Sequence, residues 1–284
     1  MGMISPKYTF QGERMLDKLK KRPLSAALLL VFLYGLWFVL PAMIKEIDPN
    51  IKNIEGIQGV LNMWSSEAIT ATGLVLFLSL MGWWKKIGFQ RVEKGGLKFL
   101  LPIFLTALLF LNFAWVFDDS NKWFLGFSSP VELLSVIGVV ILLGFVEEGI
   151  FRGALFYGLS TKFTPLFTVI LTTVIFGLFH FVNLLTGKPF TDTLYQVVHA
   201  GGMGFLYAAL RLRLGAIWPL MLMHGFWDFS LFVLQSAHGE NAQAAVNTIS
   251  PLGFIIAVPA LLYGTFIYWR WTKTHHTDIT QKVV

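Results

Sequence analysis

The chain of 284 residues has no cysteine and is poor in charge, with 13% charged residues against about 25% in soluble domains. Without cysteine, it cannot form a disulfide framework or a thiol-based metal or catalytic site. The shortage of charge leaves too little polar surface to solvate a globule of this size. Because 55% of the residues are hydrophobic, we expect lipid to be the solvent for most of the protein.

The net charge of +6 does not indicate a nucleic-acid partner, because the Lys and Arg residues lie between apolar segments and form no basic stripe. They indicate topology instead. When the N-terminus is assigned to the cytoplasm, 18 of the 22 Lys and Arg residues fall in segments on that side. This bias follows the positive-inside rule and predicts that both termini are cytoplasmic.

Eight apolar segments each come close to the roughly 20 residues that cross a hydrocarbon core of about 30 Å. Three of them are preceded by an N-cap residue and a proline, at Ser129-Pro130, Thr164-Pro165 and Ser250-Pro251, which predicts helix starts there. The segments cover residues 23–44, 68–84, 99–117, 131–157, 166–182, 194–210, 217–234 and 252–271.

The predicted fold is an all-α, polytopic membrane helix bundle with about eight transmembrane helices. We expect residues 1–284 to form a single membrane domain, because no loop is long enough for a second one. Its parts are three leading helices in residues 1–128, a core in residues 129–235, and a last helix and tail in residues 236–284. The expected location is the lipid bilayer of a bacterial cytoplasmic membrane.

Several ionisable side chains fall inside the predicted spans, where burial in lipid is costly and such residues usually mark function. The glutamates have a second interpretation, as residues solvated at the interface if the fourth helix ends near them. Each lone histidine has a second interpretation too, as a hydrogen-bonded core residue. The residues are Glu147 and Glu148 with Arg152, then His180, His199, and His224 with Asp228.

The positions of these residues along the chain predict that they meet. If the fourth and fifth spans form a hairpin that turns near Phe163, Glu147 lies 16 residues before the turn and His180 lies 17 after it. Both are then about 24 Å from the tip. His224 enters from the same side, seven residues after Ile217. A hairpin that projects into the cytoplasm by two or three turns would bring all three to one depth, about 10 Å into the membrane.

Spacing within each helix supports a site. His224 and Asp228 are i and i+4, so the carboxylate can orient or charge the imidazole. Glu148 and Arg152 have the same spacing, whereas Glu147 points about 100° away from Glu148. One glutamate should therefore face the cavity while the other holds the arginine. Spacing alone does not settle which, although the residue at i+4 from Glu147 is uncharged, as suits a general base in an apolar cavity.

At this point the sequence resembles the CPBP family, which comprises the type II CAAX prenyl endopeptidases and bacteriocin-processing relatives. The resemblance covers roughly residues 131–234, and the three motifs occur in the expected order in the fourth, fifth and seventh spans. The motifs are Glu147-Glu148-x-x-x-Arg152, Phe176-x-x-x-His180 and His224-x-x-x-Asp228.

The resemblance implies a role for each residue of the first two motifs. Glu147 would be the base that activates water, and His180 would help to hold that water. Glu148 and Arg152 would form a supporting pair. The implied activity is that of an intramembrane endopeptidase without a cofactor, which hydrolyses a peptide bond with a glutamate-activated water.

The third motif departs from the family pattern. His224 and the residue at position 228 would stabilise the oxyanion, and family members usually carry Asn where this chain has Asp228. An ionised carboxylate accepts hydrogen bonds but donates none, so Asp228 cannot complete an oxyanion hole as an amide would. We therefore assign Asp228 to orienting His224 or to raising its positive charge.

Other functions remain open at this stage. Glu147, His180, His224 and Asp228 would also make an acceptable nitrogen and oxygen ligand set for zinc, as in an intramembrane metalloprotease. We favour the metal-free mechanism because the chain has no HExxH pair. A transporter or channel, and an inactive scaffold or immunity protein, are further alternatives. The expected substrate is a membrane-associated peptide or protein, with lipidated substrates among those that are compatible.

Overall fold

The computed structural model describes residues 11–47, 57–118, 120–237 and 242–275, and these are almost entirely helical. Within these ranges the β-type pairing is a single bridge between Phe124 and Phe127. The helices are α1 (Gln11–Lys20), α2 (Pro23–Ile47), α3 (Ile57–Met81), a 3₁₀ turn (Leu97–Leu100), α4 (Leu101–Val116), α5 (Pro130–Glu148), a π-helix (Gly149–Leu155), α6 (Phe156–Ser160), α7 (Pro165–Phe179), a second 3₁₀ segment (His180–Thr186), α8 (Phe190–Leu214), α9 (Trp218–Ser236) and α10 (Ala242–Thr274).

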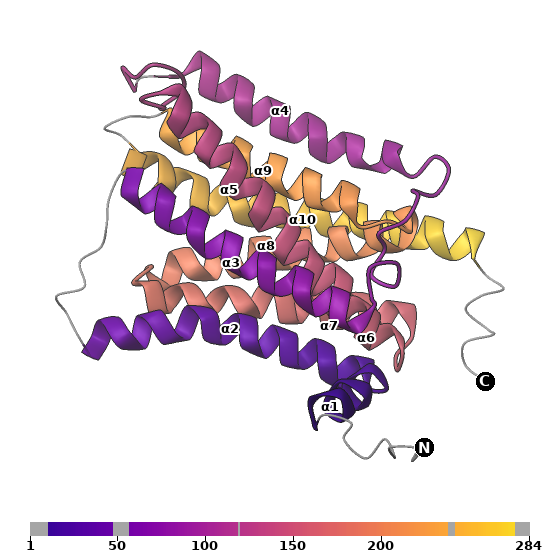
Figure 1. Cartoon of the computed structure of the whole chain (residues 1–284). Coiled ribbons are helices and arrows are strands. Elements are labelled where there is room, and N and C mark those ends of the chain that lie inside the picture. Colours follow the sequence, from indigo (N-terminus) through magenta and orange to yellow (C-terminus); the bar gives the residue numbers. More distant parts are fainter. Residues whose placement is uncertain (1–10, 48–56, 119, 238–241, 276–284) are drawn as a thin grey trace, which may run out of the picture.

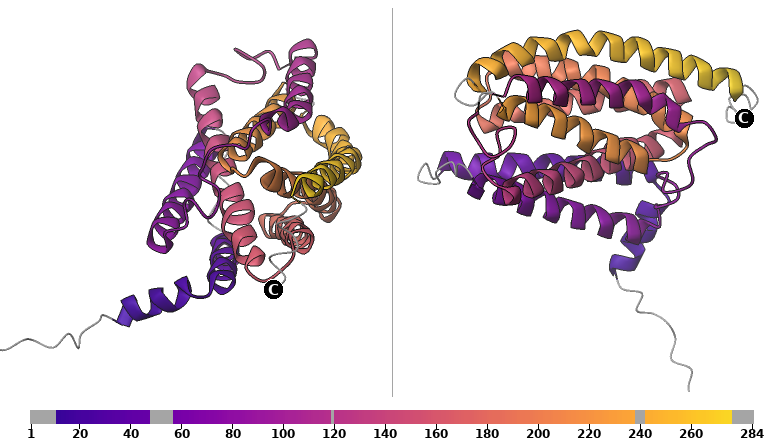
Figure 2. Two further views of the ribbon diagram at one scale, coloured as in Figure 1. Left: turned by 90° about the vertical axis from the view of Figure 1, so that its right-hand side faces the viewer. Right: turned by 90° about the horizontal axis from the view of Figure 1, so that it is seen from above.

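The long helices lie side by side with their axes roughly aligned, and the views of Figure 1 and Figure 2 agree on this bundle. This confirms the predicted all-α membrane bundle. Helices α8, α9 and α10 lie in the same bundle, and the predicted total of eight spans stays a prediction. Among the described residues, five helical segments are long and apolar enough to cross a membrane: Pro23–Leu40, Trp64–Met81, Leu97–Val116, Pro130–Ser160 and Pro165–Leu185.

Two of the three predicted helix starts are confirmed. Ser129 and Thr164 each precede the proline of a helix, and each side chain accepts a hydrogen bond from the backbone N–H three residues later. The start predicted at Ser250-Pro251 is wrong, because α10 begins at Ala242 and continues through both residues. The stretch before Ser250 is rich in alanine, the strongest helix former, and membrane helices tolerate an internal proline.

Close contact between α5 and α9 positions the site. A Cβ on Gly144 of α5 would collide with the carbonyl oxygen of Met221, and a Cβ on Gly225 of α9 would lie 2.7 Å from the carbonyl oxygen of Val140. The two backbones therefore touch, as small residues allow in membrane helix packing. The residues just beyond this contact include Glu147 on α5 and the two polar residues of α9.

The bundle has two distinct ends. We call the basic end the one that holds the loop 82–96, the turn 161–164 and the segment 215–217, and Figure 1 shows the start of α2 and the last turn of α10 there as well. The opposite end holds the starts of α5 and α8 and the last turn of α9. The cytoplasmic location of the termini stays a prediction.

Candidate active site

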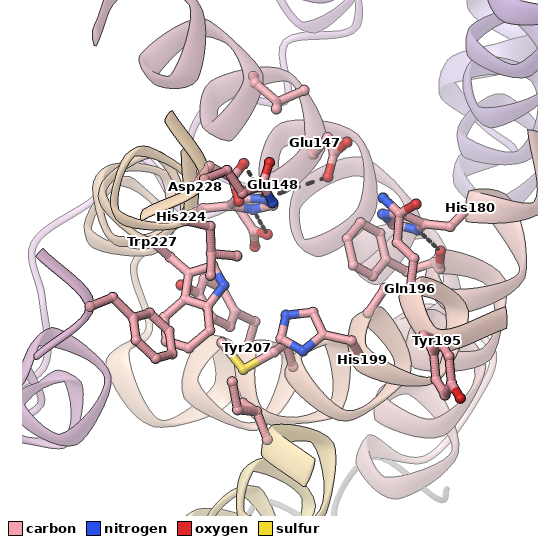
Figure 3. A pocket seen from close by; sticks show the side chains of 18 of the residues that line it. Glu147, Glu148, His180, Tyr195, Gln196, His199, Tyr207, His224, Trp227 and Asp228 are labelled. Atoms are coloured by element: carbon pink, nitrogen blue, oxygen red, sulfur yellow. Dashed lines mark hydrogen bonds and ion pairs between the residues drawn. The ribbon is translucent and has the colours of Figure 1, made fainter. Parts of the chain in front are cut away.

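A cavity of about 460 Å³ lies between helices α4, α5, α8, α9 and α10 and the residues on either side of the α7 C-terminus. Figure 3 shows polar side chains from separate helices pointing into it. All of the residues that the sequence singled out line this cavity: Glu147, Glu148, Arg152, His180, His199, His224 and Asp228. The structure therefore brings together residues that lie up to 81 positions apart in the chain, from Glu147 to Asp228.

Glu148 and Arg152 form the buried ion pair of the site. Arg152 Nη1 donates to Glu148 Oε1 over 2.9 Å, and the side chains are 1% and 0% exposed. The arginine also lies flat against an aromatic ring, with its guanidinium carbon 3.8 Å from the centroid of Phe176. This resolves which glutamate holds the arginine. Glu147 stays outside that pair and keeps 14% of its side chain exposed, in the cavity wall.

A π-helix follows the two glutamates, which the sequence analysis did not predict. It covers Gly149–Leu155, and every residue in it is buried. Such wide turns are rare and often occur at functional sites. The local signal was the pair of glycines, because a Cβ on Gly149 would lie 2.6 Å from Leu74 Cδ2 and one on Gly153 would lie 3.1 Å from Ile217 Cδ1. The glycines let this segment pack tightly against neighbouring elements.

His224 lies among three carboxyl groups. Its Nδ1 is 2.8 Å from Glu148 Oε1, at hydrogen-bond distance. Its Nε2 faces two more distant oxygens, Asp228 Oδ2 at 3.4 Å and Glu147 Oε2 at 3.6 Å. The sequence analysis assigned Glu148 to Arg152 alone and the orientation of the imidazole to Asp228. In the structure the closest partner of the imidazole is Glu148, and Asp228 places a negative charge near its other nitrogen.

His180 has one ring nitrogen committed and one facing the cavity. Helix α7 ends just before it, and its Nδ1 is 2.9 Å from the carbonyl oxygen of Phe176. A carbonyl only accepts, so Nδ1 carries the hydrogen and Nε2 keeps a lone pair. The imidazole also packs edge-on against Phe176 at 4.8 Å between ring centroids. In Figure 3, His180, Glu147 and His224 lie around one side of the cavity.

One face of α8 completes the wall, and the sequence analysis gave its residues no role. Tyr207 packs edge-on against His224 at 5.8 Å between ring centroids, and His199 stacks on Trp227 at 5.9 Å. His199, Met203 and Tyr207 all line the cavity. Their i, i+4, i+8 spacing was the signal that could have placed them on one helical face.

The site carries three carboxyl groups, Glu147, Glu148 and Asp228, against two cationic partners, Arg152 and a protonated His224. With every group ionised, the carboxylates are in excess by one charge. Carboxyl groups that share a low-dielectric site cannot all ionise easily, so a proton held among them lowers the electrostatic repulsion. The cluster is thus suited to taking up and releasing a proton.

The arrangement does not fit a zinc site. Among the residues that the structure describes, no group of three or more His, Asp or Glu side chains is placed to hold a metal ion. Both nitrogens of His224 face carboxylate oxygens, and His180 Nδ1 faces a backbone carbonyl. A metal at the ligand distances of about 2.0 to 2.2 Å would require His224 and the carboxylates to rearrange.

The comparisons with known proteins agree with this placement. Residues 129–230 match the family described as type II CAAX prenyl endopeptidase, Rce1-like. The matched segment begins at the N-cap of α5 and includes every one of the six residues predicted for catalysis. This confirms the resemblance that the three motifs indicated. No curated protein matches the chain.

Proposed function

Since residues 129–230 belong to the Rce1-like family of CAAX-type intramembrane proteases, we propose that this chain hydrolyses a peptide bond with a water molecule activated by Glu147. The observation that supports this most is the convergence of Glu147, His180 and His224 on one cavity within the bundle. We place the enzyme in the cytoplasmic membrane of a bacterial cell, with a membrane-associated peptide or protein as its substrate.

The attack step uses Glu147 and His180. A water between them donates one hydrogen to a Glu147 oxygen and the other to His180 Nε2, whose lone pair is available because Nδ1 is bound to Phe176. The water oxygen then attacks the scissile carbonyl while Glu147 takes up its proton. Positioning and proton transfer together lower the barrier, and general base catalysis alone is typically worth about 10²- to 10⁴-fold.

The developing oxyanion is stabilised from the other wall. A protonated His224 held by Glu148 at Nδ1 can donate from Nε2, since no carboxylate is closer to that nitrogen than 3.4 Å. When the tetrahedral intermediate collapses, Glu147 passes its proton to the leaving amine, and the carboxylate is restored. Asp228 holds negative charge beside the imidazole and donates nothing itself.

The broad function is tested by comparing the membrane-associated peptides and protein termini of cells with and without the protein. We expect new N-termini in a small set of membrane-associated chains only when the protein is present. Cells that produce His180→Ala at an equal level serve as the control and should lack these termini. Identical terminal profiles in all three strains, under conditions where the protein is made, would contradict a protease function.

The metal-free mechanism predicts that activity survives strong chelators. Purified active protein should keep its cleavage rate after prolonged treatment with EDTA, and it should contain far less than one metal ion per chain. The measurements are a cleavage assay and elemental analysis on the same sample. Loss of activity in EDTA with recovery on adding zinc would favour the metalloprotease alternative, because a catalytic zinc supplies the activated water itself.

Asp228→Asn separates the charge of this side chain from its shape. The amide removes the negative charge beside His224, which should slow the reaction, and adds a donor that can bind the oxyanion, which should speed it. We expect these effects to offset each other to within about tenfold, whereas Asp228→Ala removes both interactions and should cost about a hundredfold or more. Cleavage rates of both variants from about pH 5 to pH 8 measure this.

An asparagine variant as impaired as the alanine variant would show that the negative charge itself is required. That result would argue against a role limited to positioning and charge near His224, and for ligation of a metal or an obligatory ion pair.

A further inference from the structure

The cavity extends from the catalytic residues toward one end of the bundle only. Its innermost lining residues, Arg152 and Tyr207, are 1% and 3% exposed. Its lining continues to Lys188 and Asp192 at the start of α8 and to Gln235 in the last turn of α9. These three residues are at the opposite end of the bundle, as defined above. Along this path the lining changes from fully buried to exposed at Lys188.

The lining at this opening is polar. Lys188 Nζ donates to Gln196 Oε1 over 2.9 Å, and Asn183 Nδ2 donates to the same oxygen over 2.8 Å. Burial lowers the pKa of the Lys188 ammonium, an effect that the nearby Asp192 carboxylate opposes. A polar entrance that leads to buried catalytic groups is suited to admitting an extended peptide together with water.

The basic end is closed by a built plug, formed by the loop 82–96 on the segment 211–217. Three hydrogen bonds hold the two together: Ile217 N–H to the Gly88 carbonyl at 2.9 Å, Glu93 N–H to the Leu214 carbonyl at 2.9 Å, and Gln90 Nε2 to the Gly215 carbonyl at 2.7 Å. An ion pair between Arg213 and Glu93 adds to them at 3.2 Å.

Apolar side chains fill the space beneath these bonds. Ile87, Trp83, Leu214 and Ile217 are all 0% exposed. The guanidinium of Arg211 packs so closely on Gly88 that a Cβ there would be 2.6 Å from Nη2. No residue of the loop 82–96 or of the turn 161–164 lines the cavity. Both the lining and the plug therefore direct access to the opposite end.

We infer that the substrate enters from the non-cytoplasmic face of the membrane, through the opening at Lys188, Asp192 and Gln235. Eighteen of the 22 Lys and Arg residues fall in segments on the side of the basic end, which the positive-inside rule assigns to the cytoplasm. The opening is then on the outer side. Resting on the proposed protease function, this makes the substrate class exported chains: peptides or membrane-anchored segments whose cleavage site has already crossed the bilayer.

Single cysteines test this directly, because the native chain has none. Leu231→Cys places a thiol in the cavity wall, and Gln235→Cys places one nearer the opening. Lys86→Cys marks the basic end, and Leu222→Cys, at a side chain 56% exposed on the bundle surface, marks the lipid-facing side. The probe is a membrane-impermeant methanethiosulfonate that carries a trimethylammonium group, applied to right-side-out and to inverted membrane vesicles.

We expect the two cavity cysteines to react at least about tenfold faster in right-side-out vesicles, Lys86→Cys to react only in inverted vesicles, and Leu222→Cys to react in neither. Cavity cysteines that react from the same side as Lys86→Cys, or from neither side, would overturn the access route. Lys86→Cys reacting from outside would overturn the exported substrate class. Labelling needs no turnover, so an inactive enzyme would refute the proposed function without changing this result.

Discussion

Replacing Glu147 with glutamine should lower the cleavage rate by about 10²- to 10⁴-fold while the protein inserts and purifies normally. Glutamine keeps the shape of the side chain, but its amide cannot accept a proton from water at neutral pH. The fold should tolerate the change, because Glu147 takes no part in the ion pair with Arg152 and its nearest cationic contact is His224 at 3.6 Å. Removing one of three clustered carboxyl groups also lowers their mutual repulsion.

The matched control is Glu67→Gln, which makes the same chemical change at another membrane-buried glutamate. Glu67 is 8% exposed, contacts Thr70 and does not line the cavity. Single-turnover cleavage of one substrate by the three proteins, with melting temperatures in detergent, provides the comparison. The control should cleave at nearly the wild-type rate. Retained turnover in Glu147→Gln would refute the glutamate mechanism, whatever the state of the control.

The helices and the gathering of the polar residues could be predicted from the sequence because both follow from local rules. Span length and capping residues gave α5 and α7, and the turn 161–164 between α6 and α7 lies where the hairpin of Glu147 and His180 required it. The i, i+4 spacing gave the pair of Glu148 and Arg152. A lipid environment strengthens such reasoning, since buried ionisable groups must find partners among the few available.

The partners of His224 could not be predicted in the same way, because they depend on how two helices cross. The 2.8 Å contact from His224 to Glu148 joins residues 76 positions apart. It exists because Gly144 and Gly225 let the backbones of α5 and α9 touch, and one added methyl group on either would separate them. Spacing within α9 could only offer Asp228 as the partner. The start of α10 was missed for the opposite reason, since local cap and proline signals were given too much weight.

Arg152→Met should destabilise the protein by roughly 3 to 5 kcal/mol, the usual cost of removing one partner of a buried ion pair. Glu148 is 0% exposed, so its carboxylate would be left in a low-dielectric site with His224 as its only strong partner. Methionine is close to arginine in length and can pack on Phe176, where the guanidinium now lies. Lost packing is therefore a minor part of the effect.

The double variant Arg152→Met, Glu148→Gln distinguishes the buried charge from other causes. Removing the unpaired carboxylate should restore most of the lost stability, since replacing both members of a buried ion pair by groups of similar volume is often close to neutral. Thermal unfolding in detergent measures this, with Arg270→Met as the control. Arg270 is exposed on α10, and its loss should change stability by less than about 0.5 kcal/mol. A double variant as unstable as Arg152→Met would show that the arginine acts through packing.

Activity should not recover together with stability in the double variant. The glutamine introduced by Glu148→Gln could still accept a hydrogen bond from His224 Nδ1, but it would no longer hold a negative charge beside the imidazole that we propose donates to the oxyanion. We therefore expect a stable protein whose cleavage rate is still lowered by about tenfold or more. This split would show that Glu148 serves two partners, Arg152 for stability and His224 for catalysis, as its contacts at 2.9 Å and 2.8 Å indicate. Recovery of both properties together would mean that Glu148 is needed only to neutralise the arginine.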